Sequence, residues 1–166
     1  MKKKSPPRPL DTFDRAILRI IQHNNKMPQR QIATQVNLSA AAVQRRIAIM
    51  EKAGVIVTNS AIVDVNAVRM NITAIVEVHL TDERLQTVDN AKTLFRAAPE
   101  VQQCYYVTGG ISFMLIIVSQ DMTSYEETTR RLFAQNDSVA SYRTLIALDR
   151  VKSGSDIIIP SGDCPG

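Results

Sequence analysis

Gln44 and Arg45 stand side by side in a stretch of helical periodicity, and the small residue Ala41 precedes them by about one helical turn. Gln and Arg side chains form paired hydrogen bonds with the edges of DNA bases. Small residues let a helix backbone lie deep in the major groove. This combination predicts a DNA-reading helix. On spacing alone, an ordinary helical hairpin with a solvated Gln/Arg face is the alternative.

Other polar and cationic residues around this stretch divide into two expected roles. Contacts with base edges specify a sequence, whereas contacts with phosphates only position the protein. For Arg46 the alternative is an internal role that braces the motif. We expect base-edge contacts from Ser39, Ala41, Gln44 and Arg45, and phosphate contacts from Lys26, Gln29, Arg30 and Arg46.

Two helices within residues 29–56 must position these side chains, and a sharp turn separates them. Asn37 tolerates the positive φ that such a turn needs, and Ser39 is a favourable N-cap for the second helix. Gly54 predicts the end of that helix. Apolar residues at helical spacing predict the buried faces, which are Ile32, Ala33 and Val36 in the first helix and Val43, Ile47 and Met50 in the second.

A third helix is expected before this pair, capped at Asp11 or Thr12. After the pair, two short strand-like runs predict a small hairpin over residues 55–63. Three helices and a hairpin form a winged helix-turn-helix domain, which we place at residues 10–63. Residues 1–9 are basic and lead into proline rather than an apolar region, so they predict a disordered arm and not a signal peptide.

The net charge of +4 is distributed unevenly along the 166 residues. Residues 1–60 contain eleven Lys/Arg and three Asp/Glu, a net charge of +8, whereas residues 61–166 carry a net charge of −4. A basic module beside an acidic remainder suits a DNA-facing domain joined to a domain with a different task.

After residue 64 the sequence changes to β-type runs that alternate with helical patterns. Their order, β-α-β-β-α-β, is that of a ferredoxin-like split motif. We therefore expect an α+β protein, with a linker at residues 64–71, a ferredoxin-like domain at residues 72–152 and a tail at residues 153–166. Two helices would cover one face of the antiparallel sheet. The apolar strands predict that a second protein chain covers the other face.

Histidine and cysteine are too sparse for a metal site. His23, His79, Cys104 and Cys164 have no partners at metal-ligand spacing. The cysteines also give no disulfide framework, so a cytoplasmic location is the default. No window reaches the roughly 18 uncharged apolar residues of a membrane span.

Adjacent carboxylates occur as Asp82-Glu83 and as Glu126-Glu127. They fall on an expected loop and an expected helix surface, where solvated charge is the usual explanation. No Gly-rich phosphate loop or nucleophile motif is present. We therefore expect no catalytic activity, no cofactor and no metal.

A winged helix-turn-helix followed by a βαββαβ domain resembles the Lrp/AsnC family of bacterial and archaeal regulators, the leucine-responsive and asparagine-operon regulators. The resemblance covers residues 10–152, nearly the whole chain. Single matches are weak signals, but the ordered set at these spacings is specific. The matching residues are Leu10-Asp11, Asp14, Ile17-Leu18, Ile32-Ala33, Leu38-Ser39, Val43, Arg46-Ile47, Gly54-Val55-Ile56, Pro99-Glu100-Val101, Cys104-Tyr105, Val107-Thr108-Gly109 and Val151-Lys152.

The resemblance implies a transcription regulator that binds double-stranded DNA and whose second domain binds a small effector, often an amino acid. In the family, dimers commonly assemble into octamers, and the effector lies near the turn between the second and third strands, at an interface between dimers. The implied effector residues are Thr108, Gly109, Gly110 and Ser112 at the turn, and Ile146 and Ala147 on the last strand. A plain hairpin turn and plain strand core are the alternatives for these two groups.

The turn departs from the family pattern. The family typically shows Gly-x-x-Asp, where the acid can meet an ammonium group, whereas this sequence has Gly109-Gly110-Ile111-Ser112. Ser112 accepts a hydrogen bond but provides no charge, and a charged contact typically contributes more than a neutral one. The site would then bind an amino acid weakly, bind something else or be unused. The alternative function is an architectural DNA-binding protein, whose DNA affinity and assembly do not respond to a ligand.

Overall fold

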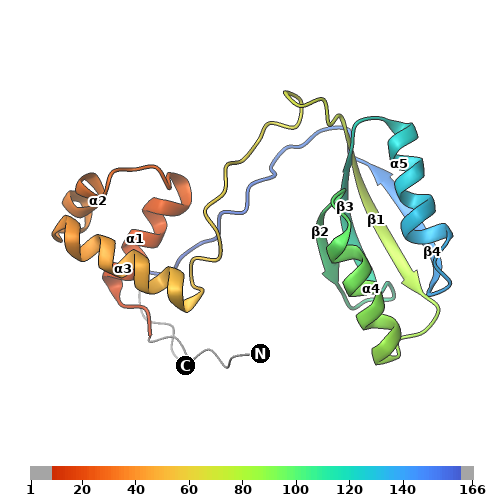
Figure 1. Ribbon diagram of the computed structural model, residues 1–166, viewed down its shortest axis with the longest axis horizontal. Helices are drawn as coiled ribbons and strands as arrows, with labels where there is room; N and C mark the ends of the chain where they lie inside the picture. Colours follow the sequence, from red (N-terminus) through yellow and green to blue (C-terminus); the bar gives the residue numbers. More distant parts are fainter. Residues whose placement is uncertain (1–8, 162–166) are drawn as a thin grey trace. The chain divides into compact units, whose positions relative to one another are not determined.

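The computed structural model describes residues 9–161 and divides them into two units. One unit contains the residues up to Ala61 together with the tail from Ser153 onward, and the other contains Ile62–Lys152. Residues 1–8 of the predicted arm and residues 162–166 of the predicted tail lie outside the described residues. The helices and strands of both units are labelled in Figure 1.

The first unit contains three helices, α1 (Thr12–His23), α2 (Gln29–Val36) and α3 (Ala40–Ala53). A capping box begins α1. The Asp11 carboxylate accepts a hydrogen bond from the Asp14 amide at 2.8 Å, and the Asp14 carboxylate accepts one from the Asp11 amide at 3.3 Å. This reciprocal pairing satisfies amide groups that the first turn of a helix leaves unbonded.

The turn between α2 and α3 has the geometry that its residues predict. Asn37 adopts the left-handed conformation, with φ 54° and ψ 45°. The Ser39 hydroxyl accepts a hydrogen bond from the Ala42 amide at 3.2 Å and so caps α3. Gly54 ends α3 with a φ of 76°. These local choices fix the ends of both helices, and the predicted helix-turn-helix is confirmed.

One apolar core holds the three helices together. Ile17 and Val43 are fully buried, and Ile32 and Met50 are 2% and 1% exposed. Burial of each such side chain contributes roughly 1.5–3 kcal/mol. Because α2 has only eight residues, this packing rather than helix propensity must stabilise it.

The hairpin predicted over residues 55–63 is absent. No strand occurs between Val55 and Met70, all of which the structure describes. Residues 58–60 lack the Asn-Gly or Asp-Gly pair that favours a tight hairpin. Val57 and Ile62 are 88% and 85% exposed, so neither packs against the core of the unit, and an isolated two-stranded ribbon is marginal. The prediction of two strands here was wrong.

The second unit follows the predicted order of strands and helices. Its strands form one antiparallel sheet in the order β2-β3-β1-β4. This arrangement matches a ferredoxin-like fold, so the predicted α+β fold class is confirmed. The elements are β1 (Ile72–Leu80), α4 (Leu85–Ala97), β2 (Val101–Tyr106), β3 (Phe113–Ser119), α5 (Met122–Thr129) continuing as a π-helical turn (Arg130–Ala134), and β4 (Val139–Ile146).

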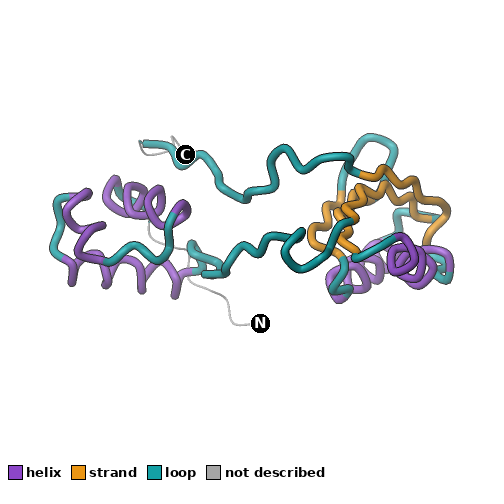
Figure 2. Tube along the Cα trace, turned by 90° about the horizontal axis from the view of Figure 1, so that it is seen from above, coloured by secondary structure: helices purple, strands orange, loops and turns teal. Residues whose placement is uncertain are grey.

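Helices α4 and α5 cover the same face of the sheet (Figure 2). Beneath them, Ala74 and Val78 of β1 are fully buried, as the alternation of a half-covered strand requires. Phe95 of α4 packs edge-on against Phe113 and Phe133, with ring centroids 5.3 and 5.9 Å away. This face of the sheet is the core of the unit.

No helix of the described second unit covers the opposite face of the sheet. Tyr105 and Leu145 are 54% and 45% exposed there, although large apolar side chains seldom gather on a solvated surface. Directly paired positions form two rows across this face, Gln103-Ile116-Ile75-Leu145 and Tyr105-Met114-Glu77-Arg143.

The described part of the tail packs against α1 of the first unit and does not extend the sheet. The side-chain amide of Gln22 makes two hydrogen bonds with the backbone of Ile157. Its Nε2 donates to the Ile157 carbonyl at 3.0 Å, and its Oε1 accepts from the Ile157 N–H at 3.3 Å. Arg19 donates to the carbonyl oxygens of Ile159 and Pro160, both at 3.0 Å. Residues 157–159 therefore form no edge strand.

Candidate DNA-binding surface and effector pocket

The predicted reading residues lie on the exposed side of α3. Ala41, Gln44 and Arg45 are exposed, whereas Val43 and Met50 face the core. The Gln44 and Arg45 side chains make no hydrogen bond or ion pair with the other described residues. Both are therefore available for the edges of bases.

The residues predicted to contact phosphate lie around α2. Lys26, Gln29 and Arg30 are exposed. The N-terminus of α2 has no side-chain cap, so its amide groups add to the positive character of this region. Ser39, predicted near base edges, is also exposed, but its hydroxyl already caps α3. Its structural role is independent of DNA.

Arg46 binds residues of its own unit. Its Nη1 lies 2.7 Å from both Asp11 Oδ2 and Asp14 Oδ1, and its guanidinium carbon lies 5.4 Å from the Phe13 ring centroid. Hydrogen bonds with Asp11, and then with Asp14, raise the pKa of Arg46 above its ordinary value. Asp14 is fully buried and needs a cation. This geometry favours the internal brace over the predicted phosphate contact.

The turn between β2 and β3 forms one wall of a cavity of about 410 Å³. Thr108, Gly109, Gly110 and Ser112, all predicted for the effector site, line this cavity. Gly109 and Gly110 have φ values of 109° and 94°, which L side chains rarely adopt. A Cβ atom at either position would meet nothing within 4 Å. The two glycines thus satisfy the backbone and leave open space beside the turn.

Ser112 is 4% exposed, and its hydroxyl bonds within the protein. Its Oγ accepts a hydrogen bond from the Leu80 amide at 3.1 Å and donates one to Glu83 Oε1 at 2.5 Å. The Tyr106 hydroxyl donates to Glu83 Oε2 at 2.8 Å. The bond from Ser112, and then that from Tyr106, lowers the pKa of Glu83, because both stabilise the charged form. Glu83 is therefore a fixed anionic group on the cavity wall.

The sequence placed Glu83 on a solvated loop, and the residue is exposed there, but sequence reasoning did not predict its hydrogen bonds with Ser112 and Tyr106. Glu83 lies 29 residues before Ser112, so spacing carries no signal of their contact. One signal was available: an acid is missing at position 112, and the loop after the first strand carries two acids, Asp82 and Glu83.

Ile146 and Ala147 do not join the turn within one chain. Ile146 pairs with Ala74, and the Ala147 amide donates to the Thr73 carbonyl at 2.9 Å. The turn instead contacts the other end of β1, where the Ser112 amide donates to the Val78 carbonyl. At about 3.4 Å per strand residue, roughly 15 Å separates the two groups. A site that uses both would need a second subunit.

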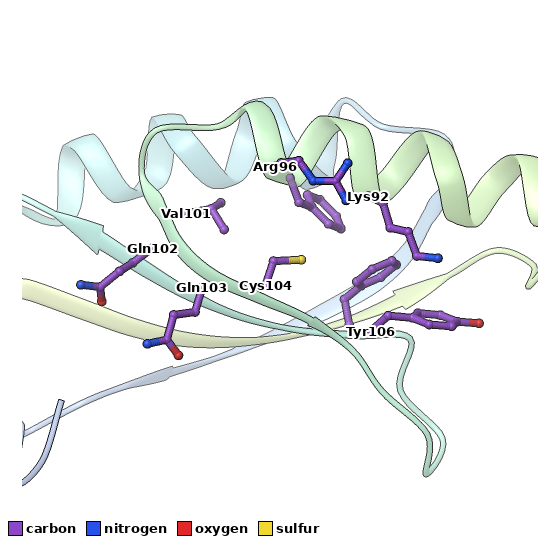
Figure 3. Close-up of a pocket in the computed structure, with 9 residues that line it drawn as sticks. Lys92, Arg96, Val101, Gln102, Gln103, Cys104 and Tyr106 are labelled. Atoms are coloured by element: carbon purple, nitrogen blue, oxygen red, sulfur yellow. The ribbon is translucent and has the colours of Figure 1, made fainter. Parts of the chain in front are cut away.

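A separate cavity of about 400 Å³ lies between α4 and β2 (Figure 3). Lys92 and Arg96 line it from α4, and Cys104 and Tyr106 line it from β2. Burial raises the pKa of the Cys104 thiol, so this thiol is a poor nucleophile at neutral pH. None of the predicted effector residues lies in this cavity.

Within residues 9–161, no group of three or more His, Cys, Asp or Glu side chains is placed to hold a metal ion. No helix in the same range is long and apolar enough to cross a membrane.

Each of the two units matches the model of a known protein family. A family model of the Lrp/AsnC ligand binding domain matches residues 73–157. A family model of a winged helix-turn-helix DNA-binding domain matches residues 10–57.

Similar proteins match almost the full chain. An uncharacterized HTH-type transcriptional regulator of Sinorhizobium fredii is 41% identical over 144 residues, which are 87% of this chain and 85% of the relative. An AsnC family transcriptional regulator from Agrobacterium tumefaciens has a similar structure, with 26% identity and a TM-score of 0.83 over 90% of this chain and 97% of that one. The feast or famine regulatory protein from M. tuberculosis, complexed with L-methionine, has 27% identity and a TM-score of 0.81 over 91% and 99% of the two chains.

Proposed function

This chain belongs to the Lrp/AsnC family of DNA-binding transcriptional regulators, which are not enzymes, and from that premise we propose that it is a sequence-specific regulator whose DNA affinity is controlled by an amino-acid effector. The observation that carries this proposal is the combination of two features in one chain. These are the exposed Gln44-Arg45 face of α3 and the open cavity at the glycine turn. Because it acts on chromosomal DNA, we place it in the cytoplasm.

In this proposal α3 enters the major groove. Ala41 lets the helix approach closely, and Gln44 and Arg45 read base edges. Lys26, Gln29 and Arg30 contact phosphates and set the register. A homodimer would present two copies of α3 to half-sites about one helical turn, roughly 34–36 Å, apart.

The dimer forms through the uncovered face of the sheet. Its two rows of side chains are largely apolar, with the ion pair of Glu77 and Arg143 at one end of a row. A second copy of the same surface would bury Tyr105 and Leu145 in a two-fold symmetric interface. Association of dimers into an octamer, as the family resemblance implies, would bring Ile146 and Ala147 of one subunit toward the turn of another.

The effector is an amino acid that binds beside Gly109, Gly110 and the Glu83 carboxylate. A similar protein has been solved with L-methionine, which supports this ligand class. An effector at a subunit interface favours one assembly over another. DNA affinity then shifts by the difference in effector affinity between the two assemblies.

A thermal-shift screen of the purified protein against the twenty amino acids tests the proposal. Binding of an effector to the native state should raise the Tm, by more as the ligand concentration exceeds Kd. Light scattering on any hit should show a change in mass if assembly is the switch. No shift with any amino acid at millimolar concentration would contradict an amino-acid effector.

The second candidate is an architectural DNA-binding protein without an effector. The observation that favours it is Ser112, which stands where the family usually has an acid. Such a protein would bind DNA and assemble in the same way, but no ligand would change its DNA affinity or its mass.

A further inference from the structure

Both side chains that donate hydrogen bonds to the Glu83 carboxylate are neutral hydroxyl groups. Glu83 lies between β1 and α4, and its two oxygens accept hydrogen bonds from the hydroxyl groups of Ser112 and Tyr106. Among the described residues, no Lys, Arg or His forms an ion pair with it. A carboxylate offers about four lone-pair sites, so two remain for another donor. Two neutral hydroxyls fix its position but do not neutralise it.

The cavity beside Glu83 is also lined by residues with backbone N–H groups, which are hydrogen-bond donors. The amides of Gly109, Gly110 and Ile111 donate no hydrogen bond within the described chain. All three residues line the cavity, and a Cβ atom built on either glycine would meet nothing within 4 Å. A ligand that carries both an ammonium and a carboxylate group would therefore find an acceptor and donors in one cavity of about 410 Å³.

We infer that Glu83 binds the ammonium group of a zwitterionic effector, and that Ser112 and Tyr106 hold the Glu83 carboxylate in position. This inference rests on the proposed effector function of the cavity. In this inference Glu83 supplies the negative charge that position 112 lacks. Ser112 is a positioning residue that bonds to Glu83 and the β1 backbone.

The competing explanation is purely structural. Glu83 would then tie the loop after β1 to β2 and β3, and a neutral Gln could replace it without any effect on charge recognition. The two explanations differ in one property. Only a ligand-binding role makes the effect of the substitution depend on whether the ligand carries a positive charge.

Isothermal titration calorimetry of the full-length protein separates them. The probes are the amino acid that gives the largest thermal shift and its 2-hydroxy acid, which has the same carbon skeleton without the ammonium group. Glu83→Gln keeps an acceptor for Ser112 and Tyr106 but removes the charge. Glu127→Gln is the matched control, because Glu127 is an exposed carboxylate on α5 outside this cavity. Tm values of each variant without ligand verify folding.

We expect Glu83→Gln to weaken binding of the amino acid by about 10- to 100-fold, as the loss of a hydrogen bond to a charged group implies. Binding of the 2-hydroxy acid should change by less than about threefold, and Glu127→Gln should bind both ligands like the wild type. Equal losses for both ligands, or unchanged amino-acid binding by folded Glu83→Gln, would overturn the role inferred for Glu83 but not the proposed effector. A wild-type protein that binds no amino acid would instead overturn the proposed effector.

Discussion

Arg45 and Arg46 are adjacent in the sequence, yet their surroundings give them different tasks. Arg45 is exposed on α3 without a partner among the described residues. Arg46 lies between the carboxylates of Asp11 and Asp14. DNA affinity should therefore depend directly on Arg45, and the stability of the first unit should depend on Arg46.

Arg45→Ala should weaken binding to a specific duplex by about 10- to 100-fold and leave binding to an unrelated duplex within about threefold, because a base contact carries sequence information. Lys26→Ala removes a phosphate contact and should weaken both similarly. Fluorescence anisotropy at one fixed salt concentration measures all four affinities. Equal losses on both duplexes for Arg45→Ala would remove Arg45 from the base-reading set.

Arg46→Ala should lower the free energy of unfolding of the first unit by about 2–3 kcal/mol, because the variant loses the ion pairs of Arg46 with Asp11 and with the buried carboxylate of Asp14. We place this below the loss for fully buried pairs, since the Arg46 side chain is 20% exposed. Urea unfolding followed by the helical circular dichroism signal measures the change. Arg45→Ala is the control and should stay within about 0.5 kcal/mol of the wild type. If Arg46→Ala were equally stable, the brace would be refuted.

The sequence predicts roles at this scale when they depend on neighbours in the chain. Asn37, Ser39 and Gly54 are such residues, because turn and cap geometry is local. The partners of Arg46 lie 35 and 32 residues away, and Glu83 lies 29 residues from Ser112. No spacing rule connects residues at these separations, so these roles required the fold.

Helices and paired strands were predictable at the scale of elements because their apolar residues repeat at 3.6 or 2 residues. The failed hairpin over residues 55–63 shows the limit of this reasoning. A strand needs a neighbour with which to bond, and periodicity does not say whether one is present. The contacts of the tail could not be predicted either. Gln22 and Arg19 bond to backbone groups of the tail, and no side-chain pattern reveals such contacts.

The pair of Glu77 and Arg143 across β1 and β4 should make the stability of the second unit depend on pH. Arg143 donates to Glu77 at 2.7 and 2.8 Å, and these hydrogen bonds lower the pKa of Glu77 below its ordinary 4.5. Because the pKa is lower in the folded state, the contribution is present above pH 4.5 and is lost as pH falls through the folded pKa.

Glu77→Gln should therefore have a lower Tm than the wild type at neutral pH, and the difference should shrink as the pH falls below about 4.5. Thermal melts across this range measure it, with Glu127→Gln as the control for loss of an exposed carboxylate. A difference in Tm that does not change with pH would mean that the charge of Glu77 is not the cause.

For the whole molecule, we propose that assembly depends on the uncovered face of the sheet. Leu145→Glu places a charge in the apolar row that includes Ile75 and Ile116, and burying an unpaired charge in the dimer would be costly. We expect a smaller assembly by multi-angle light scattering. Thr123→Glu, exposed on α5 at the helix-covered side, should keep the wild-type mass. An unchanged mass for Leu145→Glu would contradict this interface.

The central claim is that an amino acid controls the affinity of this protein for a specific DNA sequence. The most direct test is an anisotropy titration of a duplex selected by the protein from random sequence, with and without a saturating amino acid from the thermal-shift screen. We predict that the amino acid changes the Kd by about 5-fold or more, while an unrelated duplex shows a much smaller change. Identical Kd values with and without the amino acid would contradict the claim and favour the architectural role.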